Sequence, residues 1–140
     1  MAEFFASLKA DFIKCFITRN RWEFITEGLS ATLKITLLSC IMGIVIGLVV
    51  AIIRSTYDKN YKQMRGGFGK FFLAITNFFC NIYLTVIRGT PVVVQLMIMY
   101  YIIFASSSNG ILIAVSAFGI NSGAYVAEIF RSGIMSIDGG

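Results

Sequence analysis

The segment "ITLLSCIMGIVIGLVVAII", Ile35 to Ile53, decides the fold because it is long, apolar and uncharged. It contains 12 Leu, Ile or Val residues, and each favours membrane insertion by about 0.3 to 0.6 kcal/mol near a helix centre. A helix needs about 20 residues to cross the hydrocarbon core, and the range 29–53 supplies them. We therefore predict a membrane-spanning helix over 29–53.

Two glycines in this segment, Gly43 and Gly47, are four residues apart. Such spacing lets a second membrane helix approach closely, but glycine is also frequent in membrane helices generally. The spacing alone leaves open whether the two glycines form a helix-packing site.

The composition of the whole chain is that of a membrane protein. Of its 140 residues, 57% are hydrophobic and 14% are charged, whereas roughly 25% are charged in soluble domains. The net charge of +5 does not indicate nucleic-acid binding, because Lys and Arg avoid the apolar runs and form no binding motif. The three cysteines have no short spacing, so they indicate neither a disulfide framework nor a metal site. We predict an all-α integral membrane fold.

Residues 1–28 mix four basic with four acidic residues before the first membrane helix. Charges interrupt every candidate apolar core, so a cleaved signal peptide is not indicated. The apolar side chains recur every three to four residues, which predicts an amphipathic helix at the membrane surface. They are Phe4, Phe5, Leu8, Phe12 and Phe16.

The stretch from Arg54 to Lys70 carries five basic residues and one acidic residue. Short loops with such an excess stay in the cytoplasm. The first membrane helix is therefore predicted to run from outside to inside, with the N-terminus outside and residues 54–70 forming a flexible cytoplasmic loop.

The next apolar region, residues 72–104, is interrupted by "RGTP" at Arg88 to Pro91. One straight helix of this length would be too long to span, and two helices would be short. If the region crosses once, with its start lying along the cytoplasmic interface and a break at Pro91, the third helix, about 111–134, returns to the cytoplasm. If it crosses twice, the tail lies outside. The sequence chemistry leaves both open, although a single crossing lets Arg88 reach the cytoplasmic interface.

Polar side chains inside the apolar segments are the candidate functional groups, because burying them in a membrane is costly without partners or a wet cavity. They either form hydrogen bonds between helices or line a polar pathway for a small solute. The sequence has no His, no catalytic motif and no close carboxylate pair in an apolar segment, so an enzyme is not indicated. The polar residues are Asn77, Asn81, Gln95, Asn121, Ser122 and Glu128.

The end of the third predicted helix combines charge with turn chemistry. Glu128 and Arg131 are spaced i, i+3 and can form an ion pair on one helix face. Turn-forming residues follow them and end the apolar helix. These are Gly133, Ser136, Asp138, Gly139 and Gly140.

Two ordered stretches, "VIRGTPVVVQLMIMYYIIF" and "INSGAYVAEIFRSGIMSIDGG", resemble the permease subunit of ATP-binding-cassette (ABC) importers for polar amino acids. The first matches the family pattern R-G-T-P-x-x-V-Q through residues 88–91 and Gln95. The second matches A-Y-x-A-E-x-x-R-G-G-I-x-S-I-x-x-G-Q from Ala124 to Gly140, with Ser132 in place of the commoner first Gly. "GLSATLKITLLS", residues 28–39, resembles the start of the family's first membrane helix, so the similarity covers about residues 28–140.

The resemblance implies a type I (MetI-like) ABC importer transmembrane domain. Residues 29–140 would supply about three of its five membrane helices, and residues 135–140 would begin the cytoplasmic coupling segment. We therefore expect the chain to be the N-terminal part of a longer permease. A cytoplasmic coupling segment after the third helix also favours the single crossing.

The resemblance also implies partners in a bacterial inner membrane. A second permease subunit, identical or related, would complete the pathway, and an extracellular or periplasmic binding protein would deliver a glutamine-, glutamate-, arginine- or histidine-like amino acid. ATP and Mg²⁺ would bind to cytoplasmic ATP-binding subunits, so no cofactor is expected on this chain.

Residue roles follow from the same resemblance as expectations. Gln95, Asn121 and Ser122 are predicted to line the substrate pathway. Arg88, Gly89, Thr90 and Pro91 form a structural motif. The ATPase-side coupling region would contain Glu128, Arg131, Gly133, Ser136, Asp138, Gly139 and Gly140. Two alternatives from other classes remain: a small membrane scaffold or regulatory protein, or a simple channel, complete at 140 residues.

Overall fold

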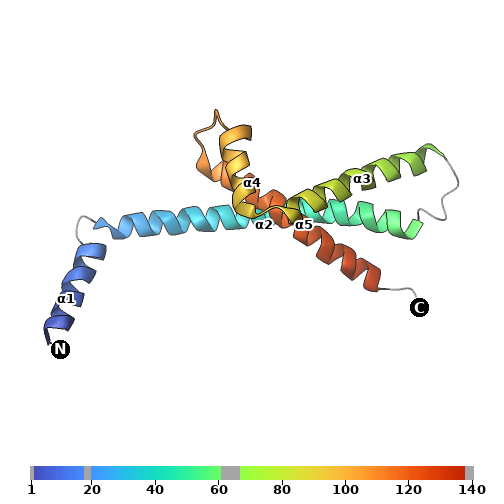
Figure 1. The fold of residues 1–140 in the computed structure, drawn as a ribbon. Coiled ribbons are helices and arrows are strands. Elements are labelled where there is room, and N and C mark those ends of the chain that lie inside the picture. Colours follow the sequence, from blue (N-terminus) through green and yellow to red (C-terminus); the bar gives the residue numbers. More distant parts are fainter. Residues whose placement is uncertain (1, 18–19, 61–66, 138–140) are drawn as a thin grey trace. The chain divides into compact units, whose positions relative to one another are not determined.

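A computed structural model describes residues 2–17, 20–60 and 67–137, and the regular structure of these residues is entirely helical (Figure 1). The predicted all-α fold class is confirmed. The elements are α1 Ala2–Phe12, η1 Ile13–Ile17, α2 Trp22–Asn60, α3 Phe68–Gly89, α4 Val92–Ile98, η3 Met99–Ile103 and α5 Gly110–Ser136.

Three of the described helices are long and apolar enough to cross a membrane: α2, α3 and α5. Their number agrees with the three spans expected from the sequence. The apolar helix that follows α3, Val92–Ile103, is shorter. The chain is thus a multi-pass membrane protein.

Helix α2 is longer than the predicted span of 29–53. It begins at Trp22, inside the predicted N-terminal segment, and ends at Asn60. At 1.5 Å per residue its length exceeds the roughly 30 Å of the hydrocarbon core. Residues 54–60, predicted as loop, are helical because side chains of this last part of α2 bind α5. Residues 61–66 of the predicted loop lie outside the described residues, and residues 68–70 of it form the first turn of α3.

The helix break predicted at Pro91 divides α3 from α4. Proline has no N–H to donate and disfavours helical geometry in the residue before it, and Thr90 is accordingly extended. The carbonyl of Pro91 then accepts hydrogen bonds from the amides of Val94 and Gln95, which starts α4. The region predicted as one broken span, 72–104, is therefore two helices: α3, which begins earlier at Phe68 and is long enough to cross a membrane, and the shorter apolar helix Val92–Ile103.

The chain divides into two compact units, residues 1–34 and 35–140. In the second unit, α2, α3 and α5 meet around one apolar cluster. Its buried members are Val50, Cys80, Leu84, Ala124 and Ala127.

Small residues bring α2 and α5 into close contact. A Cβ atom added to Gly43 would lie 2.7 Å from the Ser122 Oγ, and one added to Gly47 would lie 2.9 Å from the backbone nitrogen of Ala127. Both distances are shorter than a normal contact, so the two glycines form a helix-packing site. This decides between the two interpretations of their spacing.

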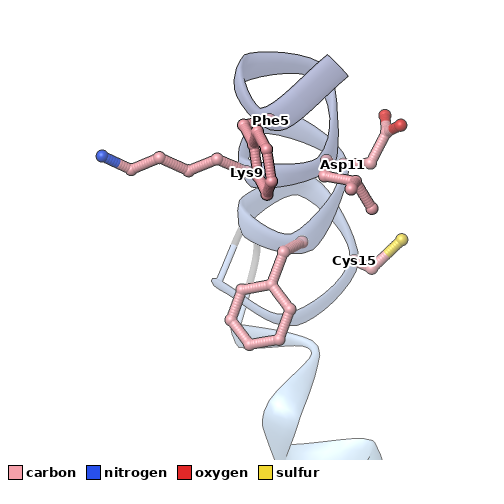
Figure 2. A pocket seen from close by; sticks show the side chains of 6 residues that line it. Phe5, Lys9, Asp11 and Cys15 are labelled. Carbon is pink, nitrogen blue, oxygen red and sulfur yellow. The ribbon is translucent and has the colours of Figure 1, made fainter. Parts of the chain in front are cut away.

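The first unit contains α1 and η1, whose apolar side chains are exposed. Phe5, Leu8 and Phe12 follow at i, i+3 and i+7, which is the spacing of one helix face. Figure 2 shows the shallow hollow beside them, with Lys9 and Asp11 directed to different sides of the helix. An exposed apolar face of this kind supports the predicted surface helix, which stays a prediction.

Candidate functional site

Glu128 on α5 is the centre of an ion-pair network that joins three helices. Its Oε2 lies 3.4 Å from the Nη1 of Arg54 on α2 and 3.6 Å from the Nη1 of Arg88 on α3. Its Oε1 lies 3.2 Å from the Nη1 of Arg131, one turn further along α5. The i, i+3 pair expected from the sequence is therefore present, with two further arginines on the same carboxylate.

Arg131 also binds Asp58 on α2, and this pair is the tightest of the network. The Nη2 and Nε atoms of Arg131 lie 2.7 and 2.9 Å from the Oδ2 of Asp58. The Nζ of Lys59 donates to the carbonyl of Ile134 at 3.4 Å. The last turns of α2 are thus fixed to the last turns of α5 by polar contacts.

Arg54 and Asp58 were not predicted as site residues, because the charged stretch that begins at Arg54 was predicted to be a loop. A signal was present, since the two residues are spaced i, i+4 and lie on one face if the helix continues past Ile53. The partner of that face, α5, is far along the chain and gives no local signal.

A polar hollow of about 320 Å³ opens beside the network. It lies between the three helices, and Arg88 at its edge is also 5.8 Å from the centre of the Tyr125 ring, within the range of a cation–π contact. Arginine and carboxylate groups share this hollow with neutral hydrogen-bonding side chains. Its lining residues are Arg54, Asn81, Leu84, Thr85, Arg88 and Glu128.

Gln95, predicted to line the pathway, is buried, and its side chain connects α4 to the end of α3 across the helix break. Its Nε2 lies 2.7 Å from the carbonyl oxygen of Ile87, and 3.1 and 2.9 Å from the carbonyl and Oγ1 of Thr90. Its Oε1 accepts a hydrogen bond from the Nδ2 of Asn121 at 3.2 Å. Both ends of the amide are therefore occupied inside the protein.

The other two predicted pathway residues lie on the packed side of α5. Asn121 is joined to Gln95, and Ser122 lies against Gly43 of α2. The bond between Asn121 and Gln95 favours the hydrogen-bonding interpretation for these two residues, and the pathway role of all three residues remains a prediction.

Some of the predicted coupling residues lie in α5, and the others lie outside the described residues. Gly133 and Ser136 lie within α5, which ends two residues later than expected, and the Ser136 Oγ donates to the Gly133 carbonyl at 2.8 Å. Gly133 is thus not in a turn. Asp138, Gly139 and Gly140 lie outside the described residues.

The predicted structural motif, Arg88 to Pro91, forms the end of α3 and the link to α4. Arg88 and Gly89 are the last residues of α3. The Oγ1 of Thr90 donates to the carbonyl of Val86 at 2.8 Å, which satisfies a helix-end acceptor. The motif therefore positions Arg88 beside Glu128 and stops the helix directly after it.

The known proteins that this chain resembles in sequence include permease proteins of amino-acid transport systems. The chain is 37% identical over 120 residues to a provisionally named glutamine transport system permease protein, GlnP, of Rickettsia typhi, covering 84% of this chain and 48% of the relative. It is 39% identical over 121 residues to the arginine transport system permease protein ArtQ of Bacillus subtilis, with the same coverage. It is 31% identical over 126 residues to the L-cystine transport system permease protein TcyB of Bacillus subtilis, covering 89% and 47%.

No protein-family model and no solved structure matches the chain. The chain spans about half the length of the curated relatives it matches. Over most of its own length, the resemblance to polar amino-acid ABC permeases is confirmed, and these relatives are transport proteins rather than enzymes.

Proposed function

We propose that this chain, whose relatives are permease components of amino-acid transport systems, provides membrane helices of an ATP-driven uptake system for a polar amino acid. The observation that carries the proposal is the similarity to glutamine, arginine and cystine permeases over 84% or more of the chain. Three helices of spanning length fit the same function. The proposed solute is an amino acid of the glutamine, glutamate, arginine or histidine kind, and the relatives' names give glutamine, arginine and L-cystine.

The partners of the proposed system are those that the resemblance to ABC importers implies. A second permease subunit would share the pathway, and an extracellular or periplasmic binding protein would deliver the solute. Cytoplasmic ATP-binding subunits would hold ATP and Mg²⁺, and the bilayer of a bacterial inner membrane would surround the helices. In this arrangement the N-terminus lies outside and the end of α5 faces the cytoplasm, which the basic residues after Ile53 support.

The Glu128 network has a proposed role in coupling. It connects α2 and α3 to the part of α5 that would face the ATPase, so a movement of α5 would be passed to both helices. Glu128→Gln and Arg131→Gln, made separately and together, are expected to lower transport at unchanged expression. Transport at the wild-type rate in all three variants would contradict the proposed coupling role.

The function is tested by deleting the gene for this chain and measuring uptake of radiolabelled L-glutamine, L-arginine and L-cystine by the cells. Uptake of at least one amino acid should fall and return with a plasmid copy. Unchanged uptake of all polar amino acids would contradict the proposal. Ion or solute flux through the purified chain without ATP would instead favour a channel.

A further inference from the structure

The charges around the polar hollow do not balance. Three arginines, Arg54, Arg88 and Arg131, face two carboxylates, Glu128 and Asp58. One positive charge is therefore unmatched within this cluster. Arg131 is already held by the short contacts to Asp58, so the unmatched charge belongs to Arg54 and Arg88.

Arg54 and Arg88 are also incompletely bonded. Both approach the same Glu128 oxygen, at 3.4 and 3.6 Å, whereas charge-assisted hydrogen bonds are usually about 2.7 to 2.9 Å long. The solvent-inaccessible Nε of Arg54 has no hydrogen-bond partner in the described part of the chain. A guanidinium group has five N–H donors, and the Arg54 and Arg88 side chains are 17% and 43% exposed, so their exposed nitrogen atoms can donate to another anion without breaking a strong contact.

The hollow fits a small solute that carries both charges. Its volume of about 320 Å³ is near the lower end of the roughly 300 to 1,000 Å³ that small-molecule sites occupy. Arg54 and Arg88 present donors to a carboxylate, and the Glu128 carboxylate can accept from an ammonium group. Asn81 and Thr85 add neutral donors and acceptors at the same place.

We infer that this hollow binds the zwitterionic head of an α-amino acid, with its carboxylate on Arg54 and Arg88 and its ammonium group on Glu128. The inference rests on the proposed transport function and places the substrate contact on α2, α3 and α5, away from Gln95 and Asn121. An anionic lipid headgroup such as phosphatidylglycerol would use the arginines but would bring no cation to the Glu128 carboxylate. The mixed charges therefore favour the amino acid over an anionic lipid.

The test measures binding of L-glutamine, L-arginine and L-cystine, and of the α-amide of each, to the purified transporter containing this chain in lipid nanodiscs. The α-amide keeps the ammonium group and side chain but lacks the negative charge of the carboxylate, and for L-cystine both α-carboxylates are replaced by amides. Wild-type protein should bind an amino acid about tenfold or more tighter than its amide. Arg88→Gln should remove this preference, and the control Arg21→Gln, an exposed arginine outside the network, should keep it.

A second variant keeps the test valid if Arg88→Gln does not fold. Thr85→Phe fills the hollow without removing a charge, and it should weaken binding of amino acid and amide alike by about tenfold or more. The inference is overturned if Arg88→Gln keeps the wild-type preference, or if Thr85→Phe binds both ligands normally.

The outcomes also separate this inference from the proposed function. The transporter could bind and accumulate an amino acid while the Arg88→Gln variant still prefers the amino acid over its amide. The proposed binding site would then be wrong, and the proposed function would stand. If no polar amino acid is bound or accumulated, the proposed function fails as well. If Arg88→Gln changes only the amount of copurified phosphatidylglycerol, the hollow is a lipid headgroup site and the inference is overturned.

Discussion

A single carboxylate, Glu128, is the counter-charge for arginines from three helices. Its side chain is 33% exposed, so solvent screens the ion pairs only in part. We predict that Glu128→Gln lowers the free energy of unfolding by about 1 to 3 kcal/mol, between the values for exposed and for buried pairs. Thermal unfolding in detergent micelles measures the change. Glu27→Gln, at an exposed position, is the matched control, and equal melting of both variants would contradict the prediction.

Gln95 shows a different use of a buried polar side chain. Its amide bonds the carbonyl of Ile87 and the amide of Asn121 at the helix break. Gln95→Leu leaves these groups without their partner, at a cost of about 1 to 3 kcal/mol. Thr76→Val removes only a local bond to the carbonyl of Phe72 and should change stability by less than about 0.5 kcal/mol. Chemical denaturation of the two variants in parallel measures this difference. An unchanged free energy of unfolding in Gln95→Leu would show that the amide does not stabilise the helix break.

At the scale of helices, two glycines should respond in opposite ways to the same substitution. A Cβ at Gly47 would lie 2.5 Å from the Val126 Cγ1 and 2.9 Å from backbone, whereas a Cβ at Gly133 meets nothing within 4 Å. Gly47→Ala is expected to destabilise the protein by about 1 to 3 kcal/mol through overpacking. Gly133→Ala is expected to stabilise it by about 0.5 to 1 kcal/mol, because alanine is the better helix former. Melting temperatures that move in the same direction would contradict the close approach of α2 and α5.

The apolar helices could be predicted from the sequence because lipid requires a long uncharged run, and the segments around Val50 and Ala117 supply one each. The break at Pro91 was also predictable, since proline excludes continuous helix geometry. The extension of α2 to Asn60 was not, because charged residues resemble a loop until their partner on α5 is known. Likewise, the pair Glu128 and Arg131 has a local spacing, but Arg54 and Arg88 reach Glu128 only through packing of distant segments.

For the whole molecule, the proposed orientation predicts which residues a membrane-impermeant maleimide reaches from outside. In a variant with Cys40→Ala and Cys80→Ala, the exposed Cys15 should be labelled in intact cells. With Cys15 also replaced, a cysteine at Asn60 should be labelled only after the membrane is opened, because the basic residues after Ile53 favour the cytoplasm. Labelling of the cysteine at Asn60 in intact cells, together with no labelling of Cys15 in the first variant, would show that the orientation is the reverse of the one proposed.

The most direct test of the account is accumulation of an amino acid by the complete transporter that contains this chain, in vesicles with ATP inside and the binding protein outside. Radiolabelled L-glutamine, L-arginine and L-cystine are supplied in turn. At least one of the three should rise above its external concentration with ATP and should not do so with a non-hydrolysable analogue. Entry that stops at equal concentrations with or without ATP, or no entry of any of them, would contradict it.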